Sequence, residues 1–99
     1  MIVDMNIPAT PVHPGEILAE EFLEPMGLTQ TALAEHLDVP VRRINEICRG
    51  RRAVSAETAW LFAQAFGTSP QFWLNLQSLY ELSRAKSEGR FHEVAEIST

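Results

Sequence analysis

The chain has 99 residues, one cysteine and 45% hydrophobic residues, which suffices for one domain with a modest core and excludes a disulfide-stabilised scaffold. A formal net charge of −5 excludes attraction of the whole surface to nucleic acid, so the distribution of charge matters more than its sum. Without a secretory signal pattern or a long apolar span, the sequence predicts a cytoplasmic protein.

Residues 1–13 lack hydrophobic periodicity and contain two prolines, so we predict a flexible N-terminal arm. A helix is predicted from Pro14 to about Leu23, where residues 25–27 (Pro-Met-Gly) break it. Its two faces differ strongly in polarity. The apolar face comprises Leu18, Ala19, Phe22 and Leu23, and the opposite face comprises Glu20, Glu21 and Glu24.

The stretch 29–52 reads as two short helices joined by a tight turn. Thr29 is a suitable N-cap for the first helix, because its hydroxyl can accept a hydrogen bond from a free amide of the first turn. The turn is expected at Asp38 and Val39, and Pro40 suits the first position of the second helix. Gly50 is expected to close that helix in a left-handed conformation. This order is typical of the helix-turn-helix, whose second helix enters the major groove of DNA.

The second of these helices combines an apolar side with an outward face that is rich in arginine. Residues 42–52 contain five arginines against one glutamate, whereas residues 1–41 contain seven acids and no Lys or Arg. Such a run can be no more than a solvated helix face. Its coincidence with the helix-turn-helix pattern favours contact with an anionic partner.

Two more helices complete the predicted fold. Ser55 is expected to cap a helix that ends at Phe66, and Ser69 to cap a longer one that runs to roughly Ser87. Residues 14–88 therefore form one all-α domain of five helices, and residues 89–99 form a frayed tail.

Three separated motifs resemble one family. The pattern TQxxLAxxLxV followed by IxxIxxGRR and a serine, at residues 29–55, is similar to the lambda-repressor-like, or Xre, DNA-binding domains. HPGEIL at 13–18 and FGTSPQFWLNLQ at 66–77 are more narrowly similar to the HigA-type, or VapI-like, antitoxins. The chain departs from the usual family pattern at Pro40, Glu57 and Trp60, which leaves the operator sequence open.

The resemblance implies a five-helix lambda-repressor-like domain that dimerises and binds double-stranded operator DNA of its own toxin–antitoxin operon. It also implies a partner, a small basic RelE-like ribonuclease toxin that the chain neutralises. Two alternatives stay open: a stand-alone Xre-type transcription regulator without a toxin, and an adaptor that binds only protein. A neighbouring reading frame for a basic protein would separate the first two, and operator binding would separate both from the third.

Within a helix-turn-helix, the start of the second helix faces the bases and groups at helix ends hold phosphates. We expect Val41, Arg42, Arg43, Asn45 and Glu46 to read bases: arginine suits guanine, asparagine adenine, glutamate cytosine and valine a thymine methyl. The residues expected at the DNA backbone or at the entry to the second helix are Gln30, Pro40, Arg49, Arg51 and Arg52. The alternative for Arg51 and Arg52 is a salt bridge to a nearby acid.

No set of residues suggests catalysis or a cofactor. His13 and Glu16 fall at a helix start and read as a cap, and Cys48 reads as a small filler of the core. No His/Cys spacing fits a metal site. The sequence thus predicts a protein that is not an enzyme and that binds no metal or cofactor.

Two further surfaces are expected to bind protein. On the first helix, an apolar side chain shares a face with three acids, which suits an interface with a basic toxin better than the acidic tail does. These residues are Ile17, Glu20, Glu21 and Glu24. On the last helix, a stripe of leucines and small residues lies on a different side from the residues that face the core. This stripe is expected to form a two-fold dimer contact. These residues are Leu74, Ser78, Leu82 and Ala85.

Overall fold

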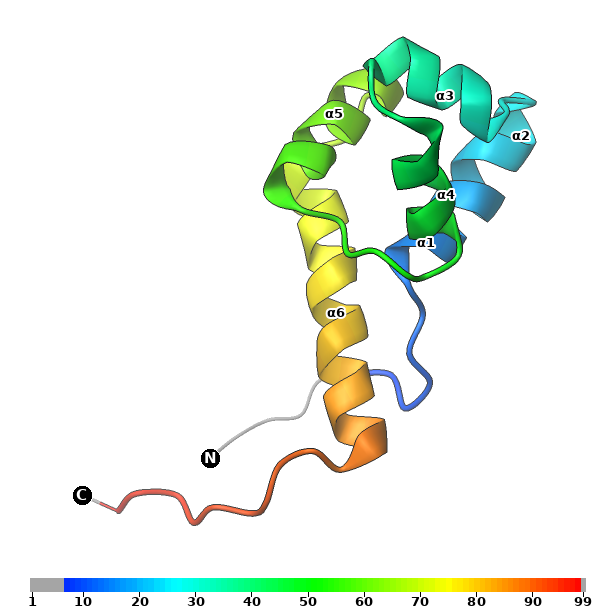
Figure 1. Cartoon of the computed structure of the whole chain (residues 1–99). Coiled ribbons are helices and arrows are strands. Elements are labelled where there is room, and N and C mark those ends of the chain that lie inside the picture. The colour runs from blue at the N-terminus through cyan, green and yellow to red at the C-terminus, as the bar shows by residue number, and fades with distance from the viewer. Residues whose placement is uncertain (1–6, 99) are drawn as a thin grey trace.

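The computed structural model describes residues 7–98, and in this part the chain folds into helices joined by short turns, with no strand (Figure 1). The first helical unit is continuous and consists of α1 (Pro14–Ile17), the π-helical η1 (Leu18–Leu23) and α2 (Glu24–Met26). The four helices that follow are α3 (Gln30–Leu37), α4 (Val41–Cys48), α5 (Ala56–Phe66) and α6 (Pro70–Glu88). The predicted all-α fold of five helices is confirmed.

The first helical unit runs further than the sequence predicts, because Pro25 lies inside its last turn instead of ending it. Upstream of this proline the hydrogen bonds follow π-helical spacing, and the Glu24 N–H donates to the carbonyl of Ala19, five residues back. This shift of the bonding pattern accommodates a residue that lacks an N–H and crowds the preceding turn. The helix ends at Gly27, whose φ of 61° lies in the left-handed region.

The caps of the helix-turn-helix follow the sequence closely. The Thr29 hydroxyl accepts a hydrogen bond from the Ala32 N–H at 3.0 Å, as predicted for the N-cap of α3. Asp38 ends α3 with a φ of 57°, a left-handed conformation that aspartate tolerates better than most residues. The prediction for Pro40 is wrong by one position: it is the N-cap of α4, with extended backbone, and Val41 is the first helical residue.

Helix α4 ends as predicted, with Gly50 at a φ of 73°. The Gly50 N–H donates to the Ile47 carbonyl at 2.9 Å, and the Arg51 N–H donates to the Glu46 carbonyl at 2.8 Å. These two bonds form a Schellman motif, which pairs carbonyls that would otherwise be free at the helix end. The chain is thereby turned sharply into the loop that carries Arg51 and Arg52.

The core centres on Trp73 of α6, which is fully buried. Its indole N–H donates to the Thr68 hydroxyl at 2.8 Å, and its ring lies 4.9 Å from that of Phe62 and 5.1 Å from that of Phe22, between centroids. The first helical unit, α5 and α6 therefore meet around one aromatic cluster. The buried residues that complete the core are Leu18, Leu23, Leu33, Ala34, Ile44, Ile47, Val54 and Ala59.

Helix α1 approaches α4 at Gly15, and no side chain could be added there. A Cβ on Gly15 would lie 1.7 Å from the carbonyl oxygen of Ile47 and 2.9 Å from the Cα of Cys48. The side chain of His13 caps the same helix, because its Nδ1 accepts a hydrogen bond from the Gly15 N–H at 2.8 Å. The start of the domain is thus fixed directly against the end of α4.

Helix α6 extends beyond the group formed by the other helices (Figure 1). Leu82 is 51% exposed, as its place in the predicted outer stripe requires, but Leu74 packs partly buried against the core. Gln77, which the sequence did not single out, is buried, and its Oε1 accepts a hydrogen bond from the Val54 N–H at 2.9 Å. Helix α6 therefore also holds the loop that follows α4.

The described part of the predicted arm, residues 7–13, is not helical and lies along α6. The hydroxyl of buried Ser83 donates to the carbonyl of Pro8, and the Lys86 Nζ donates to the carbonyl of Ile7 at 3.5 Å. Residues 1–6 of the predicted arm, and residue 99 of the predicted tail, lie outside the described residues. Residues 91–98 form no regular helix or strand.

Candidate nucleic-acid interface

Helix α4 buries Ile44 and Ile47 and leaves its other face to solvent. At its start, Val41 is 45% exposed and the side chain of Arg42 is 84% exposed. Such a helix is anchored by an apolar side while its polar side stays free for contact. Of the predicted base-reading residues, Val41 and Arg42 are therefore exposed on this helix, whereas Arg43, Asn45 and Glu46 are half-buried.

Asn45 is half-buried, because it connects the two helices of the motif. Its Nδ2 donates to the Oε1 of Gln30 at 3.1 Å. Gln30 is the first residue of α3, so this hydrogen bond ties the start of one helix to the middle of the next. Two residues that were predicted to touch DNA separately are thus brought together as a pair.

Glu46 organises the arginines on this surface. Its Oε2 accepts a hydrogen bond from the Arg42 Nε at 3.0 Å, and its Oε1 lies 2.8 Å from the Nη2 of Arg52 and accepts from the Arg52 Nε at 2.9 Å. The hydrogen bonds from Arg52, and then those from Arg42, lower the pKa of the Glu46 carboxyl. Both oxygens are engaged by arginines, so Glu46 keeps little accepting capacity for a contact with cytosine.

Arg43 is held by a residue outside the motif. Its Nη1 donates to the Oε1 of Glu57 on α5 at 2.9 Å. Sequence reasoning noted Glu57 only as a departure from the family pattern and gave it no role. Its signal was its place in the first turn of the next helix, which the short loop after α4 brings back toward Arg43.

The salt-bridge alternative holds for one of the two arginines in the loop. Arg52 pairs with Glu46, whereas neither Arg51 nor Arg49 has an ion-pair partner among residues 7–98. Both of these arginines are exposed, and both lie at the end of α4. Two guanidinium groups are therefore left available for an anion at this end of the helix.

The predicted protein-binding surfaces are separate from this one. Glu20, Glu21 and Glu24 are exposed, and Ile17 lines an apolar cavity of about 260 Å³ between residues 8–17 and α6. In the predicted dimer stripe, Ser78 is exposed and Ala85 is half-buried. Ile17 and Leu74, the apolar members of these two surfaces that the sequence placed outside, are both partly buried, so each contributes less accessible area than predicted.

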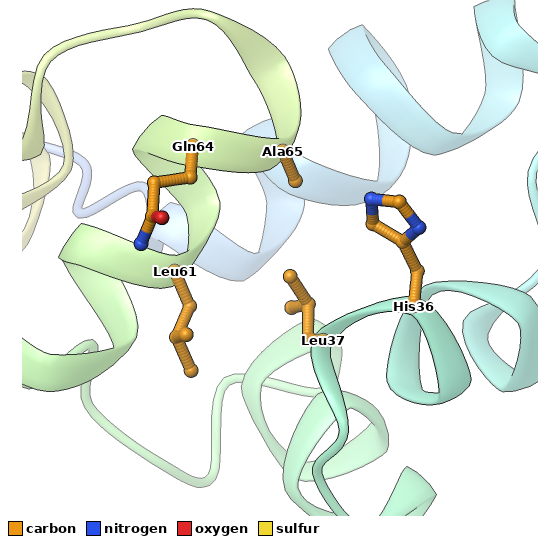
Figure 2. A pocket seen from close by; sticks show the side chains of 5 residues that line it. All are labelled: His36, Leu37, Leu61, Gln64 and Ala65. Atoms are coloured by element: carbon orange, nitrogen blue, oxygen red, sulfur yellow. The ribbon is translucent and has the colours of Figure 1, made fainter.

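A small pocket between α3 and α5 offers no chemistry. It has a volume of about 200 Å³, and Figure 2 shows His36 and Gln64 on opposite sides of three aliphatic side chains.

Among the residues that the structure describes, no cluster of three or more His, Cys, Asp or Glu could hold a metal ion. Burial raises the pKa of the Cys48 thiol, which disfavours the reactive thiolate. None of the described helices is long and apolar enough to cross a membrane.

Comparison with known proteins places this surface in context. A helix-turn-helix family model matches residues 20–73. The chain is 47% identical over 89 residues to virulence-associated protein I of Dichelobacter nodosus, with 85% of this chain and 82% of the relative covered.

Two solved structures are similar in both sequence and fold. Antitoxin HigA of Pseudomonas aeruginosa with the higBA promoter is 40% identical, with a TM-score of 0.81, over 90% of this chain and 100% of that one. A Pseudomonas aeruginosa protein in complex with its 18-bp operator DNA is 41% identical, with a TM-score of 0.83, over 89% of this chain and 98% of that one. These similarities extend well beyond the helix-turn-helix.

Proposed function

The chain belongs to the HigA-type, VapI-like antitoxins of the Xre helix-turn-helix family, and we propose that it represses its own operon as a dimer and neutralises a small basic ribonuclease toxin of the RelE type. The observation that carries the DNA-binding part is the exposed polar face of α4, on a helix whose other face is fixed in the core. The toxin partner follows from membership of the family. A member of this family is a DNA-binding regulator and not an enzyme.

In this proposal the start of α4 reads bases. Arg42 and Arg43 donate to guanine, and Val41 contacts a thymine methyl. Their partners in the free protein, Glu46 and Glu57, hold the two guanidinium groups on the outer face before DNA arrives. This preorganisation lowers the entropy that the side chains lose on binding.

In the proposal, the Gln30–Asn45 pair holds Gln30 for a contact with the DNA backbone. With its Oε1 occupied by Asn45, Gln30 retains its amide donors, which suit a phosphate at the start of α3. Arg49 and Arg51 approach phosphates at the other end of α4, and Arg52 joins them if it leaves Glu46. Pro40 sets the angle at which α4 begins.

Toxin binding is assigned to the acidic face of the first helical unit. Glu20, Glu21 and Glu24 are exposed there, and the half-buried Ile17, one turn before them, would add an apolar contact. A basic ribonuclease would be attracted to these acids and would exclude water around the isoleucine. Reversing the charge at all three glutamates should weaken toxin binding and reduce its salt dependence. Operator binding by the same variant is the control, since the acids lie outside α3 and α4.

Two measurements test the function. Fluorescence anisotropy with DNA from upstream of the gene should show saturable binding that competitor DNA of unrelated sequence does not remove. Co-expression with the neighbouring reading frame should relieve any growth arrest that this frame causes. Operator binding without relief would favour the stand-alone regulator, and loss of both would reject the proposal.

A further inference from the structure

A cleft of about 310 Å³ lies between the loop that follows α4 and the C-terminal half of α6. Arg51 and Arg52 line it from the loop, and Tyr80 and Arg84 line it from α6. Arg90, just after α6, also lines it. Four arginines from three segments therefore surround one cavity, although the proposed function gives a role only to the two in the loop.

On the α6 side, one carboxylate holds two arginines next to each other. The Glu88 Oε2 accepts from the Arg84 Nε at 3.1 Å, and its Oε1 lies 3.2 Å from the Arg90 Nε. The guanidinium of Arg84 also lies 5.7 Å from the centre of the Tyr80 ring, which restricts its movement further. Glu88 is contacted through the Nε of each arginine, so both guanidinium groups keep further N–H donors for another acceptor.

On the loop side, positive charge is in excess. Arg52 shares Glu46 with Arg42, and Arg51 has no ion-pair partner among the described residues. Four arginines line the cleft together with Glu81, and the carboxylates that pair with three of these arginines belong to Glu46 and Glu88. These groups together carry an excess of one positive charge in a chain whose net charge is −5.

We propose that this cleft binds a phosphate group between Arg51 on one wall and Arg84 and Arg90 on the other. Guanidinium groups match the geometry of phosphate oxygens and donate to them in pairs. The Tyr80 hydroxyl supplies one further donor from the same wall.

Two sources present this chemistry: the DNA backbone that flanks the bases read by α4, and a free phosphorylated small molecule. The first source rests on the proposed operator binding, and the second does not. In either case the loop that follows α4 is clamped against α6 when the site is filled.

The test uses the full chain and the double substitution Arg84→Gln with Arg90→Gln. Lys86→Gln is the matched control, because it removes a positive charge from the same turn of α6 without lining the cleft. Circular dichroism checks that each variant keeps its helices. Arg90→Gln alone serves if the double variant does not fold, since Arg90 lies outside α6.

One arm measures the affinity for operator DNA against salt concentration. Each phosphate contact that is lost should make the log–log slope less steep by about 0.9, with no change for the control. The other arm titrates inorganic tripolyphosphate into the protein without DNA. The wild type should bind it saturably at one site per chain, and the double variant should lose this binding.

A change in the first arm alone identifies a DNA phosphate, and a change in the second alone identifies a free ligand; both results support the cleft. A folded variant that matches the wild type in both arms overturns the proposal. If the wild type binds no operator DNA, the proposed function fails, and the tripolyphosphate arm still decides for or against the cleft.

Discussion

At the scale of single residues, the free protein already holds in place the side chains that the proposal assigns to DNA. Glu46 and Glu57 bind arginines of α4, and Gln30 binds Asn45. The sequence identified the outward residues of α4 because they fall between buried isoleucines at helical spacing. It could not identify the partners Glu57 and Gln30, since these lie on other helices and depend on how the helices pack, whereas Glu46 lies on α4 itself, four residues after Arg42.

Substitutions on α4 and in the loop that follows it should separate specificity for the base sequence from affinity for DNA of any sequence. Arg42→Ala or Arg43→Ala should reduce the preference at one base pair of each half-site by about 1–3 kcal/mol, because a base edge loses its donor. Arg51→Ala should weaken binding to all sequences alike, since a phosphate carries no sequence information. Anisotropy with a set of single-base operator variants measures both effects. Equal specificity in all three variants would contradict the assignment of roles.

His13 makes the stability of the first helix depend on pH. Burial lowers the pKa of its imidazole, against a hydrogen bond with the backbone of Arg52 and the charge of Glu16, which both raise it. Its Nδ1 must also stay unprotonated to accept from Gly15. The folded state therefore takes up the proton less readily than the unfolded chain does, and stability should fall as the pH drops below about 6.5.

Urea unfolding at pH 7.5 and pH 5.5 checks this expectation. The free energy of unfolding should be lower at pH 5.5 for the wild type, and this difference should shrink in His13→Asn, whose side-chain oxygen can cap the helix at both pH values. His92→Ala, in the exposed tail, is the control and should keep the wild-type difference. An undiminished pH effect in His13→Asn would assign it to other groups.

At the scale of the helices, the contact between α1 and α4 leaves no room for a side chain at Gly15. Gly15→Ala should destabilise the protein by about 1–3 kcal/mol or more, because the new methyl group would collide with the backbone at Ile47. The shift of α4 should also weaken operator binding. Thermal unfolding and anisotropy measure the two effects. Gly67→Ala is the comparison, since its Cβ would meet no atom within 4 Å and only the backbone strain at a φ of 70° applies.

The helices themselves were largely predictable, and their reasons are local. Thr29, Ser55 and Ser69 each accept a hydrogen bond from an amide of the following helix, as their positions before apolar runs predicted. The prediction that residues 25–27 break the first helix was wrong for Pro25, because the π-helical turn that accommodates this proline has no recognised sequence signal. The close approach at Gly15 was equally hidden, since glycine in a first helical turn can serve several purposes.

The wider arrangement of α6 was harder to predict. A helical projection placed Leu74 in the outer stripe, but the real helix packs it partly against the core, and it buries Gln77, which a polarity pattern would place outside. The buried glutamine is stable there because it binds the Val54 N–H and Glu81. Periodicity describes one helix at a time, whereas burial depends on the neighbours on every side.

At the scale of the whole molecule, two chains are expected to associate through the exposed part of α6. Leu82→Glu should convert the dimer to a folded monomer and reduce operator affinity, because two recognition helices about 34 Å apart are needed to read a palindrome. Sedimentation velocity measures the association. The half-buried Leu74 is left unchanged, since a charge there would disturb the core. Ser87→Glu, exposed elsewhere on α6, should remain dimeric, and a Leu82→Glu dimer would place the contact on another face.

The two tryptophans lie in opposite environments, so their fluorescence emission should differ in wavelength. Trp73 is shielded from water at the centre of the core, whereas Trp60 on α5 is 60% exposed. Indole fluorescence moves to longer wavelengths when the ring meets water, so the folded chain emits a blue component from its interior and a red component from its surface. A dissolved quencher such as iodide reaches only the second. Loss of the core should therefore shift the emission of Trp73 to longer wavelengths. Binding of a partner over α5 should instead protect Trp60 from the quencher.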